Sequence, residues 1–95
     1  SEEAKANAER MLAMGSKQLE QGNIGAARPF LQRAAEVLAE AALMLGATYD
    51  PAELPRLAPL ATSLADPKEA RKWYEKAREL GDPEAERRLG RLARR

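Results

Sequence analysis

The side chains that most often carry enzyme chemistry are scarce in this 95-residue chain, which contains no histidine and no cysteine. Their absence excludes thiolate nucleophiles, zinc ribbons, disulfide frameworks and Ser-His-Asp machinery. Carboxylates are plentiful, but Glu69, Glu75 and Glu79 are flanked by Lys and Arg side chains, mostly at intrahelical pairing distances. Charges in this pattern form a solvated helix face. We therefore expect no enzyme activity, no metal site and no cofactor.

Arginine is the other side chain that could bind a charged partner. Five arginines lie near the C-terminus, namely Arg87, Arg88, Arg91, Arg94 and Arg95. Such a cluster can hold an acidic partner, a phosphate backbone or an anionic membrane surface. The alternative is a polar capping helix whose basic end suits the negative helix terminus. We favour the capping helix, and expect no nucleic-acid binding, because no aromatic side chains interleave the arginines.

The adjacent aromatic residues Trp73 and Tyr74 have two interpretations. They could stack on a ligand or anchor an interface. They could equally fill the space between helices, as aromatic side chains of a helical array do. We favour the core interpretation.

The elements that position these side chains are predicted to be helices. Sixteen Lys and Arg oppose fifteen Asp and Glu, so no strong net charge attracts the chain to nucleic acid. Alanine is abundant and aromatics are few, which favours close-packed helices over a sheet. Every aspartate precedes a proline, and an Asp–Pro pair is a strong helix start. Together with glycine stops, these pairs predict helices over 2–21, from Asn23 onward, in a short turn after Asp50, over 67–80 and from Pro83 to the end.

No apolar run reaches the roughly 20 residues that a membrane-spanning helix needs, and no signal peptide is visible. The sequence does not indicate a compartment. We expect either a fragment of a larger, bacterial protein or a designed chain.

The chain also repeats itself. The segment from Asn23 to Glu36 returns as the segment from Asp66 to Glu79, and each copy runs on to a Leu-Gly pair, Leu45-Gly46 and Leu89-Gly90. A period of this size predicts stacked helical hairpins, in which each unit covers the apolar face of the next.

The two copies differ where a turn is expected. The second copy has Gly81 between its helices, whereas the first has no turn residue, and its apolar residues Ile24, Leu31, Leu38 and Leu45 stay in phase. One long helix over residues 24–47, kinked at Pro29, is the favoured prediction. A tight turn near Val37 is the alternative. A fused helix would separate units that should pack together, which predicts a swapped homodimer.

Residues 66–90 resemble the Sel-one-like repeat, a short relative of the tetratricopeptide repeat, and a weaker resemblance extends over 10–93. The residues that carry it are Asp66, Trp73-Tyr74, Lys76-Ala77, Gly81, Ala85 and Leu89-Gly90. The resemblance implies an all-α superhelix made of helical-hairpin repeat units over 8–35 and 39–80, with a capping helix over 83–95. The segment 47–51 looks like a bacterial subset of these proteins.

Sel-one-like proteins are adaptors and scaffolds, so the resemblance implies a protein–protein interaction module that binds a protein or peptide. The first helix of each hairpin lines the concave surface of such arrays. Partner contacts are therefore expected from Lys17, Gln18, Gln21, Met44, Thr48, Arg87 and Arg91. The alternative is a structural or engineered helical protein that self-associates through the fused 24–47 helix, and a weaker one is an RNA or membrane-surface binder acting through the arginines.

Overall fold

The computed structural model describes residues 1–95 and contains helices but no strands. The helices are α1 (Glu2–Glu20), α2 (Ile24–Ala34), α3 (Ala39–Tyr49), α4 (Leu54–Leu57), the 3₁₀ helix η1 (Pro59–Leu64), α5 (Pro67–Glu79) and α6 (Ala85–Ala93). The predictions of an all-α fold and of a short helical turn after Asp50 are confirmed.

The starts and stops of the longer helices follow from local chemistry. Ser1 caps α1 by accepting the Ala4 N–H at 3.1 Å, and Asp66 caps α5 by accepting the N–H groups of Lys68 and Glu69. Gly22 and Gly81 adopt positive φ angles of 75° and 99° just after α1 and α5. These are conformations that glycine enters without a steric penalty, so both glycines end their helices.

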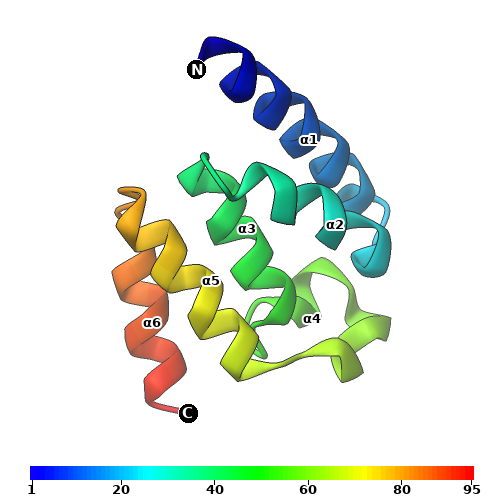
Figure 1. Ribbon diagram of the computed structural model, residues 1–95. Helices are drawn as coiled ribbons and strands as arrows, with labels where there is room; N and C mark the ends of the chain where they lie inside the picture. The colour runs from blue at the N-terminus through cyan, green and yellow to red at the C-terminus, as the bar shows by residue number, and fades with distance from the viewer.

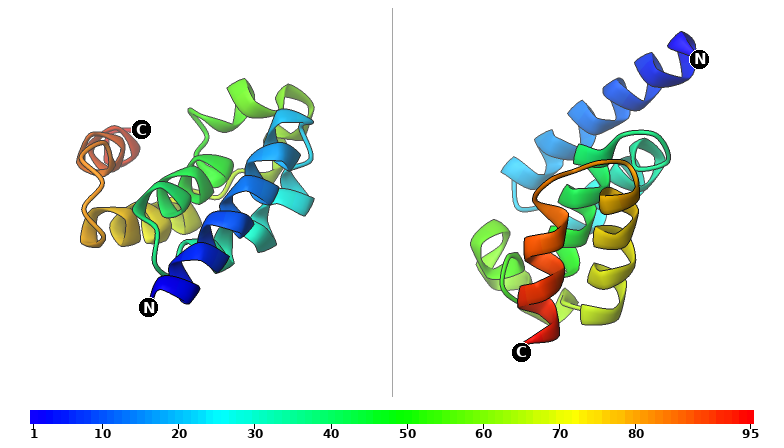
Figure 2. Two further views of the ribbon diagram at one scale, coloured as in Figure 1. Left: turned by 90° about the horizontal axis from the view of Figure 1, so that it is seen from above. Right: turned by 90° about the vertical axis from the view of Figure 1, so that its left-hand side faces the viewer.

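The helices pack as two pairs with a single helix at one end. α1 packs on α2, α3 packs on α5, and α6 lies against α5 (Figure 1). Figure 2 shows α3 in the middle of the molecule, between α1 on one side and α6 on the other. The short helices α4 and η1 form the connection between α3 and α5.

The predicted long helix over 24–47 is wrong. The chain turns after Ala34, and α3 leaves in a new direction (Figure 1). The turn closes through the N–H groups of Val37 and Leu38, which both donate to the Ala34 carbonyl, at 3.2 and 2.9 Å. The helix does not end at Pro29, where a kink was predicted, because Pro29 lies inside α2.

The seven-residue spacing misled the prediction because the turn preserves the apolar phase. Leu38 sits at the turn in an extended conformation and still packs against the core. The turn needs no glycine, since no residue outside Gly22 and Gly81 has a positive φ angle. With α2 and α3 packed on each other within one chain, the premise for a swapped dimer no longer holds.

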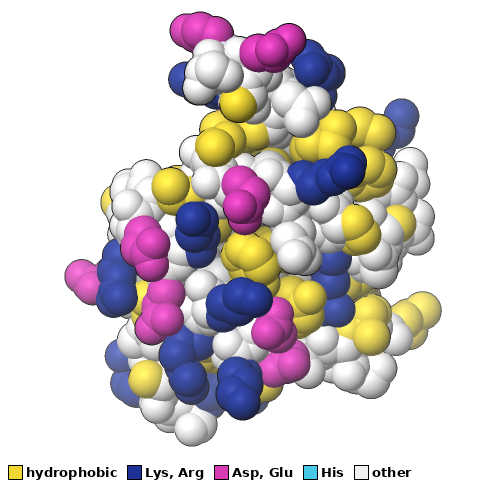
Figure 3. All heavy atoms as spheres, viewed as in Figure 1, with side chains coloured by type: hydrophobic (Ala, Val, Ile, Leu, Met, Phe, Trp, Pro, Cys, Tyr) yellow, Lys and Arg dark blue, Asp and Glu magenta, His cyan; other side chains and the backbone are white.

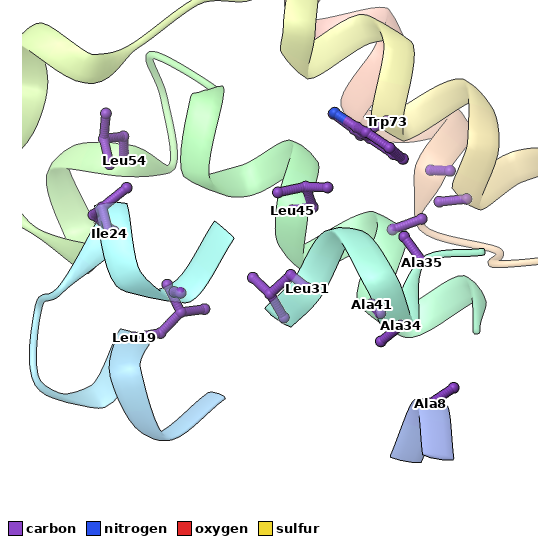
Figure 4. Packing of buried hydrophobic residues seen from close by; sticks show 14 of the residues in the cluster. Ala8, Leu19, Ile24, Leu31, Ala34, Ala35, Ala41, Leu45, Leu54 and Trp73 are labelled. Atoms are coloured by element: carbon purple, nitrogen blue, oxygen red, sulfur yellow. The ribbon is translucent and has the colours of Figure 1, made fainter. Parts of the chain in front are cut away.

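The main core runs through the whole array (Figure 4). Small residues dominate where α2 meets α3, and Leu31, Leu45 and Trp73 fill the centre. Trp73 is 6% exposed and Tyr74 is fully buried, so both aromatic rings belong to the interior as the core interpretation predicts.

Candidate partner-binding groove

The groove that we consider the candidate site lies on the side of the array formed by α1, α3, α4 and α6. It has a volume of about 170 Å³, and none of its lining residues comes from α2 or α5. Its lining residues are Leu19, Leu43, Met44, Ala47, Glu53, Leu57 and Arg88. The floor is therefore apolar, and one acidic and one basic side chain stand at its edge.

Helix α3 supplies most of the groove because it is apolar around nearly its whole circumference. Its buried face, which includes Ala41 and Leu45, packs into the core. Leu43 and Met44 pack at the margin of that core and stay partly exposed. A helix that is apolar on most of its sides can complete a core and still offer partly exposed side chains to a partner.

A buried polar cluster fixes the wall of the groove against α6. The Asp50 carboxylate is 1% exposed, and it accepts hydrogen bonds from the Tyr74 hydroxyl at 2.7 Å and from Arg91 Nη2 at 3.1 Å. Arg91 Nη2 also donates to Glu53 at 2.8 Å. Arg91 thus ties α6 to the segment that follows α3, and it does so through two carboxylates.

The same contacts set the protonation of the groups involved. Burial, together with the hydrogen bond to Asp50 and the negative charge of that carboxylate, raises the pKa of the Tyr74 hydroxyl well above its usual range. The hydrogen bond to Glu53 raises the pKa of Arg91, which keeps its charge at all ordinary pH values. At neutral pH the Tyr74 hydroxyl therefore stays neutral and Arg91 stays charged, and both serve as structural ties.

A second set of contacts holds the connection between α3 and α5 in place. Arg28 donates from Nε to the Thr48 hydroxyl at 3.2 Å, and from Nη2 to the carbonyls of Thr48 and Leu64 at 2.7 and 2.9 Å. Its guanidinium also stacks 3.7 Å from the centroid of the Tyr49 ring. Burial of this arginine lowers its pKa. Arg28 of α2 thereby holds the two ends of the segment that contains α4, and α4 provides Leu57 to the groove.

Most of the C-terminal arginines are already occupied. Arg87 and Arg88 both pair with Glu84, and the hydrogen bond from Arg87 lowers the pKa of that carboxyl. Arg91 pairs with Asp50 and Glu53. Arg94 and Arg95 have no carboxylate within ion-pairing distance. In Figure 3, basic and acidic side chains are interspersed over α5 and α6.

A second hollow of about 460 Å³ lies on the other side of Leu57, between the end of α1 and η1. It includes Gln21 and the side chain of Leu60, which is 101% exposed. Leu57 lines both hollows, so they are neighbours on the surface.

The seven residues expected to contact a partner fall into different environments. Met44 lines the groove and Gln21 lines the neighbouring hollow. Lys17 is exposed on α1, while Gln18 is half-buried and accepts a hydrogen bond from Asn23. The remaining three are Thr48, Arg87 and Arg91, and they make intramolecular contacts.

The expectation that Thr48 is exposed is wrong. Thr48 is fully buried, and its hydroxyl donates to the Leu45 carbonyl at 2.7 Å while accepting from Arg28. It has no free polar atom to offer a partner.

Sequence reasoning missed Leu19, Leu43, Ala47, Glu53, Leu57 and Arg88 as groove residues. A usable signal existed for Leu43 and Ala47, which stand four apart on a mostly apolar helix, on the face away from Ala41 and Leu45. No local signal places Leu57 or Arg88 beside Leu19, because that juxtaposition depends on the path of the whole chain.

Comparison with protein-family models, with curated proteins and with solved structures found no match to this chain. The Sel-one-like resemblance therefore rests on the residues that carry it. None of the helices combines the length and apolar character that crossing a bilayer requires. The acidic side chains do not gather into a cluster of three or more that could hold a metal ion.

Proposed function

We propose that this chain is a protein–protein interaction module that binds a peptide segment of a partner in the groove of Leu43, Met44 and Leu57. The observation that supports the proposal is the pair Leu43 and Met44 of α3, which pack at the margin of the core, stay partly exposed and line the groove. Partly exposed apolar side chains in a concavity, rimmed by charge, are typical of recognition sites.

The two edge charges suggest how a peptide would be oriented. Arg88 is 18% exposed at its side chain, and its guanidinium lies 5.9 Å from the centroid of the Tyr74 ring. Glu53 also lines the groove, and it is buried and bound by Arg91. An apolar side chain on the groove floor, with a carboxylate beside Arg88, is the simplest complement to this surface.

The occupied arginines argue for a peptide rather than a nucleic acid. Three of the five C-terminal arginines already pair with carboxylates of the same chain. Only Arg94 and Arg95 are free of such pairs, so a phosphate backbone would meet a small charged patch without an aromatic platform.

The test is a peptide library displayed on phage, selected against the folded protein. We expect enriched peptides that pair an apolar residue with an acidic one. Their affinity should fall about tenfold or more for Met44→Arg, because the new charge would block the groove floor. Gln32→Arg is the matched control, since Gln32 is exposed on α2, in a hollow that it shares with Pro29, Arg33 and Glu36 and not with any groove residue.

Met44→Arg must first show wild-type circular dichroism, and Leu57→Gln serves as a second groove variant that adds no charge. Enriched peptides that bind the groove variants and the wild type equally would contradict the proposal. So would a failure to enrich any peptide.

A further inference from the structure

Helices α3 and α6 carry the same short motif, and this internal equivalence shows a face of α6 that lacks its cover. Ala41, Leu45 and Gly46 of α3 correspond to Ala85, Leu89 and Gly90 of α6. Ala41 and Ala85 are both fully buried. Leu45 and Gly46 are buried too, whereas Leu89 and Gly90 remain partly exposed.

The glycine of this motif is the crossing point of a neighbouring helix. A Cβ atom on Gly46 would lie 2.6 Å from ring carbons of Tyr74 on α5. A Cβ atom on Gly15 of α1 would lie 2.7 Å from Leu31 Cδ2 on α2. In both pairs the glycine makes room for a bulky side chain of the helix that covers it.

At Gly90 the room exists but no such side chain fills it. The only neighbour within 4 Å of a Cβ atom there is the flexible Arg94 side chain, with Nη1 at 3.2 Å. Successive residues of an α-helix are about 100° apart, which places Gly90 almost opposite Arg88. The Gly90 face is therefore separate from the groove of the proposed function.

The charges around Gly90 indicate what kind of helix would fit. Arg94 lies against the glycine, and neither it nor Arg95 has a carboxylate partner. Glu86, one turn before Gly90, is paired with Arg78 of α5. The unpaired charge on this face is thus positive, and a covering helix gains most from acidic flanks.

We infer that the Gly90 face of α6 binds an amphipathic helix of a partner protein. That helix lays a leucine or aromatic side chain across Gly90, as Leu31 crosses Gly15 and Tyr74 crosses Gly46. A carboxylate beside that side chain binds Arg94, which swings off the glycine. This inference rests on the internal equivalence and does not depend on the groove.

The probe for a test is a labelled helical peptide with the sequence of α5, residues 65–80, with Arg71, Lys72 and Lys76 each replaced by Glu and the helix held by a side-chain lactam. Fluorescence anisotropy with the intact protein should show saturable binding that weakens with salt. Replacing the tyrosine that corresponds to Tyr74 with alanine in the probe should weaken binding about tenfold or more.

Protein variants then locate the contact. Gly90→Leu fills the crossing point and should abolish binding, and Arg94→Glu should weaken it about tenfold. Gly90→Leu must first show wild-type circular dichroism. Gly25→Ala, on α2 with nothing within 4 Å, and the groove variant Met44→Arg should bind the probe like the wild type.

Equal binding to wild type and Gly90→Leu would overturn the inference, because the probe would then be displacing α5 or binding elsewhere. Absence of binding up to about 1 mM probe at low salt would overturn it as well. Neither outcome bears on the groove, whose own test uses different peptides and variants.

Discussion

At the scale of single residues, Gly46 sets how closely α3 and α5 approach. Gly46→Ala would place a methyl group 2.6 Å from ring carbons of Tyr74, which is fully buried and held by Asp50. Overpacking of this kind costs about 1–3 kcal/mol, against a helix-propensity gain of about 1 kcal/mol. We expect a net loss in the free energy of unfolding, measured by urea denaturation.

Gly25→Ala is the matched control, because Gly25 is also helical but has nothing within 4 Å of a Cβ atom. It should gain up to about 1 kcal/mol. Equal stabilisation by both changes would mean that α3 and α5 are farther apart than the structure shows.

Tyr74 carries a second prediction, on pH dependence. Because its folded-state pKa is raised, its contribution to stability is fully present below about pH 10, the usual tyrosine pKa. Above that value the unfolded chain releases a proton that the folded chain retains. The free energy of unfolding should then fall by about 1.4 kcal/mol per pH unit as the pH rises.

Tyr74→Phe should remove that alkaline loss, and at neutral pH it should cost about 1.5–3 kcal/mol because Asp50 loses a donor. Tyr49→Phe is the control, since the ring contact with Arg28 survives the change. Urea melts at pH 7 and at about pH 11 measure both effects. A Tyr74→Phe protein with the wild-type alkaline slope would contradict the hydrogen bond.

At the scale of elements, α6 depends on Arg91 for its attachment. Arg91→Met keeps the aliphatic stem but removes the cation that pairs with Asp50 and the shorter of the two ion pairs of Glu53, whose other partner is Arg56 at 3.8 Å. Because Arg91 is 31% exposed at its side chain, we discount the cost of breaking a fully buried pair to about 1–3 kcal/mol. Amide hydrogen exchange should accelerate in α6 more than in α1 and α2.

Arg87→Met provides the comparison, because its ion pair with Glu84 is exposed to solvent and adds little to stability. The attachment of α6 through Arg91 is contradicted if both substitutions leave exchange in α6 unchanged, or if both accelerate it equally.

The elements also show how far sequence reasoning reaches. The starts of α1 and α5 and the glycine stops after them follow from local chemistry, and they were predictable. The turn near Val37 was only the alternative prediction, because its residues use right-handed and extended conformations that any side chain adopts. The groove was only partly predictable, since Arg88 meets Leu19 through tertiary packing.

At the scale of the whole molecule, a single copy of the chain buries a continuous core. The Cα radius of gyration is 12.5 Å, close to the roughly 12–13 Å expected for a compact domain of this length. Because α2 and α3 are separate helices that pack within one chain, no apolar face of theirs requires a second copy. We expect a monomer of 10.4 kDa in solution.

Light scattering on a sizing column, at two concentrations about tenfold apart, measures this directly. A mass of 10.4 kDa at both concentrations supports a free groove and a free α6 face. A stable dimer at both concentrations would show that one of these surfaces is covered by the chain itself.

The connection between α3 and α5 begins and ends at almost the same point, although part of it, including Leu54 and Ala58, is buried in the core. The Asp66 N–H donates to the Tyr49 carbonyl at 2.7 Å, so the two ends of residues 50–65 are joined by a backbone hydrogen bond. Lengthening a loop whose ends are already together costs little, only about 0.6 kcal/mol for each doubling. The exposed position at Leu60 should therefore tolerate an insertion. A reporter or a second binding domain inserted there should leave the helical array intact.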